Sequence, residues 1–221
     1  ISNILADYPD TQSRYDCMRY LNDWLTTHNC YSSILSGYRP TFCYSPLSAL
    51  EGTVGINGPV CEGYARALKV LCDQKGIPCV LQTGRAQSAA DEASEDHMWN
   101  YVQMEDGGWY AIDVTWNDPT VSGVREAVSG SENRFWFLLG SETPVSEGFT
   151  FIQSHPENPG GGFVPQGTQE WKLIAGPQLA REGIEPPQEP EPEPVFGDID
   201  GDGVVTVTDI TTLINAYLSE E

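Results

Sequence analysis

A cysteine, a histidine and an aspartate occur in this chain in settings that could support thiol chemistry. Cys61 follows Gly58-Pro59 and opens the apolar-periodic run GPVCEGYARALKVLC (58–72). The unpaired N–H groups and positive dipole end of a helix N-terminus favour a thiolate and can hold a developing oxyanion. A nucleophilic cysteine also needs a base within reach and a group that orients the base. Taken alone, a cysteine in such a run is more often a core residue.

The chain has three histidines as candidates for the base. His97 opens a strand-like run directly after a polar loop, which suits an exposed functional group. His28 ends a predicted helix, where compensation of the helix dipole is a sufficient explanation. His155 lies in the loop-like stretch SHPENPGG, which has no periodic context. We therefore assign the base to His97.

Asp113 is the candidate for the orienting group. It interrupts the otherwise apolar run WYAIDVTW (109–116), where an unpaired charge would be costly, so a partner is expected. The preceding run HMWNYVQM (97–104) is joined to it by EDGG, which is typical of a hairpin.

The loop of this hairpin decides whether the two side chains can meet. A three-residue loop, 105–107, with Gly107 in the left-handed conformation places His97 opposite Thr115. Asp113 is then the diagonal neighbour of His97 on the same face. A two-residue turn, 106–107, would place them on opposite faces unless a bulge intervenes, so the hypothesis carries a register prediction.

Hydrophobic periodicity predicts the elements that position these residues. We expect helices over 11–29 and 61–75, the second capped by Gly76. Residues 30–60 and 85–96 are expected to be irregular, and residues 141–178, rich in Gly and Pro, to wrap the surface. Strands are expected over 77–84, 97–104, 109–116 and 134–140.

Three segments carry a resemblance to a known family. GPVCEGYARALKVLCDQKGIPCVL, DHMWNYVQMEDGGWYAIDVTWNDP and RFWFLLGSETP resemble, in order, the transglutaminase-like core of bacterial cysteine enzymes, over roughly residues 10–155. The resemblance implies an α+β, papain-like fold in which the helix bearing the cysteine packs on an antiparallel sheet. By position, it implies Cys61 as nucleophile, His97 as base and Asp113 as orienter. Relatives supply a side-chain oxyanion donor from upstream, for which Tyr44 and Trp24 are the candidates here.

The C-terminal stretch DIDGDGVVTVTD (198–209) has the spacing of an EF-hand calcium loop. Calcium takes six to eight hard oxygen ligands around a tight turn, for which Gly203 occupies the sixth position. Asp closes the loop where an EF-hand usually has Glu, and the alternative is a polar turn before an amphipathic helix. The predicted Ca²⁺ ligands are Asp198, Asp200, Asp202, Val204 through its carbonyl, Thr206 and Asp209.

The surrounding stretch VFGDIDGDGVVTVTDITTLINAYL resembles one repeat of a dockerin, a calcium-dependent module that docks enzymes onto cohesin domains of extracellular scaffolds. Dockerins usually carry two repeats and one is present here. The resemblance implies a cohesin partner, contacted by Val207 and Thr208, and a secreted or cell-surface bacterial protein, with no signal peptide visible before Ile1.

Composition sets the domain organisation and excludes some partners. We expect a catalytic domain over 1–178, a Pro/Glu-rich linker over 179–195 and the small repeat over 196–221. The net charge is −21, and residues 182–221 hold 11 of the 32 acidic residues and none of the 11 basic ones. This acidity argues against nucleic acid and anionic membranes as partners, and no apolar run approaches the ~18–20 residues of a membrane span.

The six cysteines allow up to three disulfides, but a free nucleophile would leave at least one other thiol unpaired. We favour buried thiols for Cys72 and Cys79.

Together these features predict a thiol enzyme that acts on amide bonds of proteins or peptides through a thioester. Water as acceptor makes it a peptidase or amidase, and a lysine amine makes it a transglutaminase. We favour hydrolysis, because transfer needs a site that excludes water. Two further hypotheses are a catalytically silent binding module and a cellulosome-type component that serves mainly for scaffold docking. The triad itself requires no cofactor.

Overall fold

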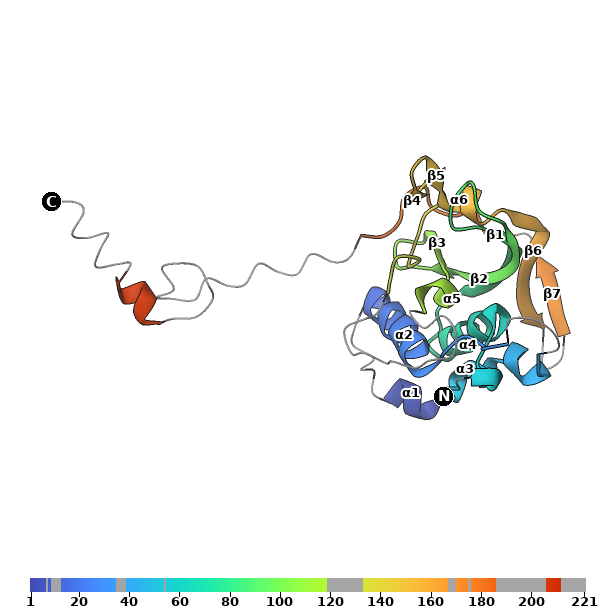
Figure 1. Ribbon diagram of the computed structural model, residues 1–221, viewed down its shortest axis with the longest axis horizontal. Helices are drawn as coiled ribbons and strands as arrows, with labels where there is room; N and C mark the ends of the chain where they lie inside the picture. The colour runs from blue at the N-terminus through green and yellow to red at the C-terminus, as the bar shows by residue number, and fades with distance from the viewer. Residues whose placement is uncertain are drawn as a thin grey trace. The chain divides into compact units, whose positions relative to one another are not determined.

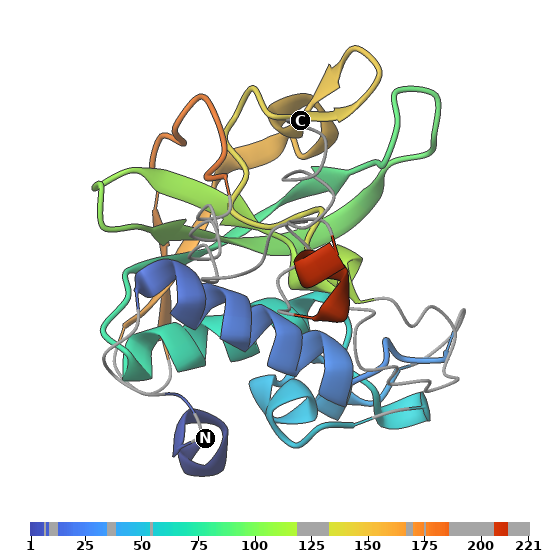
Figure 2. The same cartoon turned by 90° about the vertical axis from the view of Figure 1, so that its left-hand side faces the viewer.

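The computed structural model describes residues 1–6, 8, 13–34, 39–53, 55–118, 133–166, 170–174, 176–185 and 206–211. The chain divides into two compact units, Ile1–Ile184 and Glu185–Glu221. The first unit contains a five-stranded antiparallel sheet with the strand order β3-β2-β1-β6-β7. Helices α2 and α4 lie on one face of this sheet, and α6 with the β4–β5 hairpin lies over the other (Figure 1, Figure 2). The expected α+β arrangement of a helix packed on an antiparallel sheet is confirmed.

Helix α2 (Arg14–His28) matches the helix predicted over 11–29. Ser13 caps its first turn, because the Ser13 Oγ accepts the Asp16 N–H at 3.1 Å. Its apolar stripe of Met18, Leu21 and Leu25 is fully buried in the core between the helices and the sheet.

Helix α4 (Cys61–Gln74) begins at the cysteine, as predicted. Its end is set by Gly76, which has a φ of 67° and no Cβ to oppose that conformation. The Ile77 N–H donates to the Cys72 carbonyl at 2.9 Å and the Gly76 N–H to the Asp73 carbonyl at 3.2 Å, which forms a Schellman cap. The predicted glycine cap is confirmed.

The hairpin of β2 (Glu95–Gln103) and β3 (Trp109–Ile112) has the predicted register. Asn100 pairs with Ile112 and Gln103 with Trp109, which is the pairing that a loop over 105–107 requires. Gly107 has a φ of 81°, and its N–H donates to the Met104 carbonyl at 3.0 Å.

The strand predicted over 109–116 is wrong in its second half. β3 ends at Ile112, and residues Val114–Asn117 form the short helix α5. The cause is Asp113, whose side chain accepts the Trp116 N–H at 3.2 Å and so caps a helix start.

The central strand β1 (Cys79–Ala86) confirms the strand predicted over 77–84, two residues further along. In contrast, the region 141–178 does more than wrap the surface, because β6 (Glu157–Gln166) and β7 (Glu170–Ile174) complete the sheet. The sequence of β6, ENPGGGFVPQ, hides the strand because Gly and Pro break its alternation.

The strand predicted over 134–140 is also wrong. These residues form turns and a single bridge in which Ala111 and Leu139 exchange hydrogen bonds of 2.8 and 2.9 Å. The chain then forms β4 (Pro144–Ser146), β5 (Phe149–Thr150) and α6 (Phe151–Ser154). Trp136 and Phe151 join Trp99 and Tyr101 of β2 in a second core, distinct from the one beneath α2 and α4.

Residues 30–60, expected to be irregular, contain short helical pieces. These are η1 (Thr41–Tyr44), α3 (Pro46–Leu50) and η2 (Gly55–Asn57), and α1 (Ser2–Ala6) precedes them at the N-terminus.

The first unit extends past the expected boundary at residue 178. The Ala180 N–H donates to the Trp109 carbonyl and the Ile184 N–H to the Leu138 carbonyl, each at 2.9 Å. The start of the segment expected to be a linker therefore packs on the sheet domain. Among the described residues, no helix is both long and apolar enough to cross a membrane.

Candidate active site

Cys61 is held at the start of α4 by the loops that lead into it. The Ser32 N–H donates to the Pro59 carbonyl at 3.0 Å. Gly58 passes so close to the Cys30 carbonyl that a Cβ would lie 2.2 Å from its oxygen. Cys61 is half-buried, whereas the five other cysteines, all free thiols as well, are buried.

His97 lies on β2 beside this helix start and is 6 % exposed. Its Nε2 lies 2.7 Å from the Asp113 Oδ2. A side-chain hydrogen bond links His97 to Cys61, which leaves Nδ1 as the ring nitrogen that faces the sulfur. The structure thus brings together the cysteine, the histidine and the aspartate that the sequence analysis singled out.

Asp113 reaches His97 from the junction of β3 and α5 and is 1 % exposed. Its backbone N–H donates to the Trp136 carbonyl at 2.9 Å, which fixes the residue where the strand ends. Its Oδ1 accepts the Trp116 N–H, and its Oδ2 faces His97. The helix cap and the contact with the histidine therefore use different oxygens of one carboxylate.

His97 and Asp113 each stabilise the charged form of the other. Burial acts to lower the pKa of His97, but the Asp113 charge and hydrogen bond, with Cys61, raise it to about 10. Burial acts to raise the pKa of Asp113, yet the charge of His97 and the hydrogen bonds from His155 and His97 hold it well below its usual value. Near neutral pH the pair is an imidazolium and a carboxylate.

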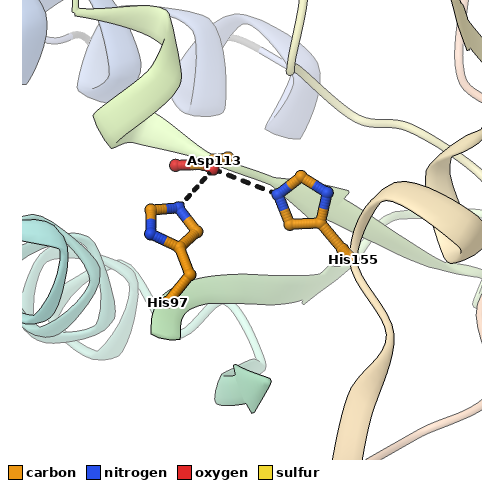
Figure 3. Close-up of side chains that lie close together, drawn as sticks. All are labelled: His97, Asp113 and His155. Carbon is orange, nitrogen blue, oxygen red and sulfur yellow. Dashed lines mark hydrogen bonds and ion pairs between the residues drawn. The ribbon is translucent and has the colours of Figure 1, made fainter. Parts of the chain in front are cut away.

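A second histidine, His155, contacts the same carboxylate. It follows α6 directly and is fully buried, and its Nε2 lies 3.2 Å from the Asp113 Oδ2. Figure 3 shows His97 and His155 pointing at Asp113 from two sides. The sequence does not reveal this role of His155, because SHPENPGG offers no periodicity from which its burial could be inferred.

Aromatic rings enclose His155. The Phe151 ring stacks on it with centroids 4.6 Å apart, and Trp99, Trp116 and Trp136 lie at 4.9, 4.8 and 5.3 Å. Trp116 also stacks on His97 at 5.2 Å. The acid–base groups therefore lie in an apolar environment, where their mutual electrostatic interactions are strengthened.

The hydroxyl of Tyr31 lies beside Cys61 and accepts a hydrogen bond from the Cys61 backbone N–H. Burial and the nearby sulfur raise the pKa of Tyr31, so this hydroxyl stays protonated. The two candidates from the sequence lie elsewhere: Trp24 stacks on His28 at 4.3 Å, and Tyr44 is exposed in η1. Tyr31 could not be identified from sequence spacing, because the hydrogen bond between Ser32 and Pro59 brings it to the helix start.

His97, Asp113 and His155 also form a group of potential metal ligands whose binding atoms lie within 4.8 Å of one another. Imidazole nitrogen and carboxylate oxygen are donors that zinc accepts. In this structure the same atoms satisfy one another directly, at the hydrogen-bond distances of 2.7 and 3.2 Å.

The predicted calcium ligands fall mostly outside the described residues, where Asp198, Asp200, Asp202 and Val204 lie. Of the two that are described, Asp209 accepts the Thr206 N–H at 2.6 Å through Oδ2. This contact caps the helix over 207–211. A carboxylate with one oxygen in a helix cap is compatible with a loop ligand, but the calcium site and the dockerin resemblance remain predictions.

Comparison with known proteins gives a family match for the first unit. Residues 5–114 match the model of the transglutaminase-like superfamily core. A solved structure of a "putative cysteine protease" from Cytophaga hutchinsonii matches with a TM-score of 0.38 and 18 % identity, over 52 % of this chain and 36 % of that one. This chain therefore spans about a third of the length of that protein. No curated protein matches.

Proposed function

We propose that this protein is a thiol enzyme that cleaves amide bonds of peptides or proteins, as a cysteine peptidase or amidase, since residues 5–114 match the model of the transglutaminase-like superfamily. One observation carries the proposal. Cys61 starts a helix within hydrogen-bonding reach of His97, whose opposite ring nitrogen is held by the buried Asp113 carboxylate. This is the arrangement of nucleophile, base and orienter that a thiol enzyme requires.

The first step is attack by the Cys61 thiolate on an amide carbonyl carbon. The imidazolium of His97 and the helix N-terminus stabilise the thiolate before attack. As the C–S bond forms, the carbonyl π electrons move to oxygen.

The second step breaks the C–N bond. His97 donates its Nδ1 proton to the departing amine and becomes neutral, and the acyl group stays on Cys61 as a thioester. Neutral His97 then takes a proton from water, whose oxygen attacks the thioester. The carboxylic acid leaves, and the thiolate–imidazolium pair of Cys61 and His97 is restored.

The acyl acceptor distinguishes a peptidase from a transglutaminase, and the same three residues could serve either. We propose water as the acceptor. Cys61, which would carry the thioester, is half-buried and so open to solvent, whereas transfer to an amine needs water to be kept from the thioester.

The test of thiol activation is alkylation by iodoacetamide at pH 6, read residue by residue by mass spectrometry. An ordinary thiol with a pKa of about 8.5 reacts slowly at that pH. Cys61 is expected to react much faster, and the five buried cysteines serve as internal controls. If Cys61 reacts at the rate of an ordinary thiol, the proposal of a thiol enzyme fails.

A peptide-library digest with and without an added primary amine then tests the acceptor. If the yield of cleaved peptides is the same with and without the amine, the reaction is hydrolysis. Peptides modified by the amine would identify a transglutaminase. The Cys61→Ala variant is the control for both. An active Cys61→Ala variant would show that the cleavage comes from elsewhere.

For residues 196–221 we propose a calcium-binding module of the dockerin type that attaches the enzyme to a cohesin of an extracellular scaffold. The alternation of acidic residues in the loop 198–209 supports this, and a secreted or cell-surface location follows from it.

A further inference from the structure

The Asp113 Oδ2 is shared by two imidazoles, and this sharing is more than the proposed mechanism requires. His97 Nε2 lies at 2.7 Å and His155 Nε2 at 3.2 Å from the same oxygen. Orienting the base takes only the first of these contacts. The second comes from a buried histidine, His155, that has no role in the steps proposed above.

The protonation of His155 follows from its neighbours. Burial lowers the pKa of His155, and this is the largest effect; of the titratable groups that act on it, Asp113 favours the charged form and His97 opposes it. His155 is therefore neutral when His97 is charged. A neutral ring has one N–H, and it must lie on Nε2, because a bare nitrogen would repel the carboxylate.

The other nitrogen of His155 has a partner that suits either charge state. Nδ1 lies 3.0 Å from the Ser154 Oγ, and this hydroxyl lies 2.6 Å from the Gln87 carbonyl. The hydroxyl has one proton: it donates to the Gln87 carbonyl while it accepts from a protonated Nδ1, or it turns to donate to Nδ1 of a neutral ring and gives up the bond to Gln87. The ring is thus held in place from both nitrogens.

The backbone of His155 is also fixed. Its N–H donates to the Phe151 carbonyl at 2.8 Å, which closes α6, and the Gln87 N–H donates to the Ser154 carbonyl at 3.0 Å. The Arg85 N–H donates to the Pro156 carbonyl at 3.1 Å. These contacts with the end of β1 leave the ring little freedom inside its aromatic enclosure.

From this geometry we infer that His155 is a positioning residue, which donates its Nε2–H to the Asp113 Oδ2 and so holds the carboxylate against His97. The inference rests on the proposed function, since it assigns His155 a role in the same site. Trp116 N–H at Oδ1 and His155 at Oδ2 fix both oxygens without using His97. The carboxylate therefore keeps its place when His97 gives its proton to the leaving amine.

Three substitutions separate positioning from packing. In His155→Gln the amide nitrogen can take the place of Nε2 and donate to Asp113. In His155→Asn the shorter side chain puts its nitrogen at the place of Nδ1, where it meets Ser154 but not the carboxylate. His155→Phe fills the space without any donor.

The measurement is the pH dependence of Cys61 alkylation by iodoacetamide, from pH 4 to 10, which needs no substrate. A hydrogen bond to a charged group is worth enough to change a rate about ten-fold or more. We expect the rate constant at pH 6 to fall about ten-fold in His155→Phe and His155→Asn. The pH at which the alkylation rate rises, called the acidic limb below, should move up toward about 8.5 in both variants. His155→Gln should stay within about three-fold of the wild type.

Each outcome decides a different point. Wild-type Cys61 without a low-pH limb would refute the thiol-enzyme proposal itself. A wild-type limb that all three variants retain would refute the role of His155 alone. The Gln variant keeps a donor that faces Asp113 and the Asn variant does not. If the two are equally impaired, the donor does not matter and His155 acts through packing.

Imidazole ¹⁵N NMR gives a second test that requires no variant to be active. The chain has three histidines, so the signals can be assigned from single substitutions. At neutral pH we expect His97 doubly protonated and His155 neutral with its proton on Nε2. A His155 that carries its proton on Nδ1 would overturn the inference.

Discussion

His97 and Asp113 meet at 2.7 Å although they come from different kinds of element, a strand and a helix cap. The hairpin register brings the two positions to one face, and the end of β3 at Ile112 then frees Asp113 to turn toward both His97 and the first turn of α5. One residue thereby ends a strand, starts a helix and orients the base.

Replacing Asp113 by Asn should impair the reaction far more than it impairs folding. The amide can still cap α5, but it carries no charge and presents a donor or a weaker acceptor to His97. We expect kcat, or the alkylation rate at pH 6, to fall about a hundred-fold or more. Asp96→Asn, at the exposed surface ion pair with Arg85, is the control and should leave the rate unchanged. Equal rates for the wild type and Asp113→Asn would remove Asp113 from the mechanism.

Conformational stability should be greatest near pH 6.5 as far as this cluster is concerned. The pKa of His97 is raised to about 10, so its stabilising contribution is complete below about 6.5, its unfolded value, and is lost as the pH rises toward 10. The pKa values of Asp113 and His155 are lowered, so their contributions are present above the unfolded values and are lost as the pH falls.

Urea midpoints from pH 5 to 10 check this prediction. The loss of stability on the alkaline side is at most about 1.4 kcal/mol per pH unit from one group. It should be smaller in Asp113→Asn, where His97 has lost the charge that raises its pKa. Parallel curves for the two proteins between pH 7 and 10 would contradict the coupling.

Gly84→Ala should disturb the site through the sheet. A Cβ at this position would lie 2.2 Å from the Pro156 carbonyl oxygen and 2.8 Å from the Trp99 ring, so the segment that carries His155 must move. We expect a loss of about 1–3 kcal/mol of stability together with slower Cys61 alkylation. Gly108→Ala is the control, because the three atoms nearest its Cβ all belong to the Tyr110 side chain and none to the segment that carries His155. An unchanged alkylation profile in a destabilised Gly84→Ala protein would mean that the segment does not act on the site.

Tyr64→Phe tests the connection between α4 and the end of α5. The Tyr64 hydroxyl donates to the Asp118 Oδ2 inside the protein, and burial raises its pKa well above the usual value. Removing the hydroxyl weakens the stabilisation of a buried carboxylate, which should cost about 1–3 kcal/mol in thermal or urea unfolding. Tyr44→Phe, at an exposed position of η1, should change stability by less than about 0.5 kcal/mol. A Tyr64→Phe protein as stable as the wild type would mean that Asp118 is satisfied by its other contacts.

Calcium should bind the loop over residues 198–209. Backbone NMR of the full chain, titrated with CaCl₂, is expected to show shifts confined to residues 198–218. The loss of one or two acidic ligands in Asp200→Ala and Asp202→Ala should abolish these shifts. Asp91→Ala, in the loop between β1 and β2, is the matched loss of charge and should leave the titration unchanged. If added calcium leaves the backbone signals of residues 198–218 unchanged, the calcium assignment fails.

The part of the site that sequence predicts best is the part built from local rules. Gly76 as a helix cap and Gly107 in a left-handed turn fix the end of α4 and the hairpin register, so the relation of His97 to Asp113 could be predicted. The premature end of β3 could not, because Asp113 serves as strand residue and helix cap in the same sequence.

His155 and Tyr31 depend on contacts distant in sequence, and no periodic pattern signals them. β6 is read poorly because its Gly and Pro residues conceal the strand next to β1 that places His155. Tyr31 reaches Cys61 only because Gly58 allows two loops to pass in close contact.

All six cysteines are free thiols, and five of them are buried in the first unit. The cohesion of this domain owes nothing to oxidation. A reductant strong enough to keep Cys61 from forming mixed disulfides or sulfenic acid would leave the scaffold intact. The protein can therefore be purified and assayed under fully reducing conditions, and loss of activity during storage in air should be reversible by added thiol as long as oxidation has stopped at those two products.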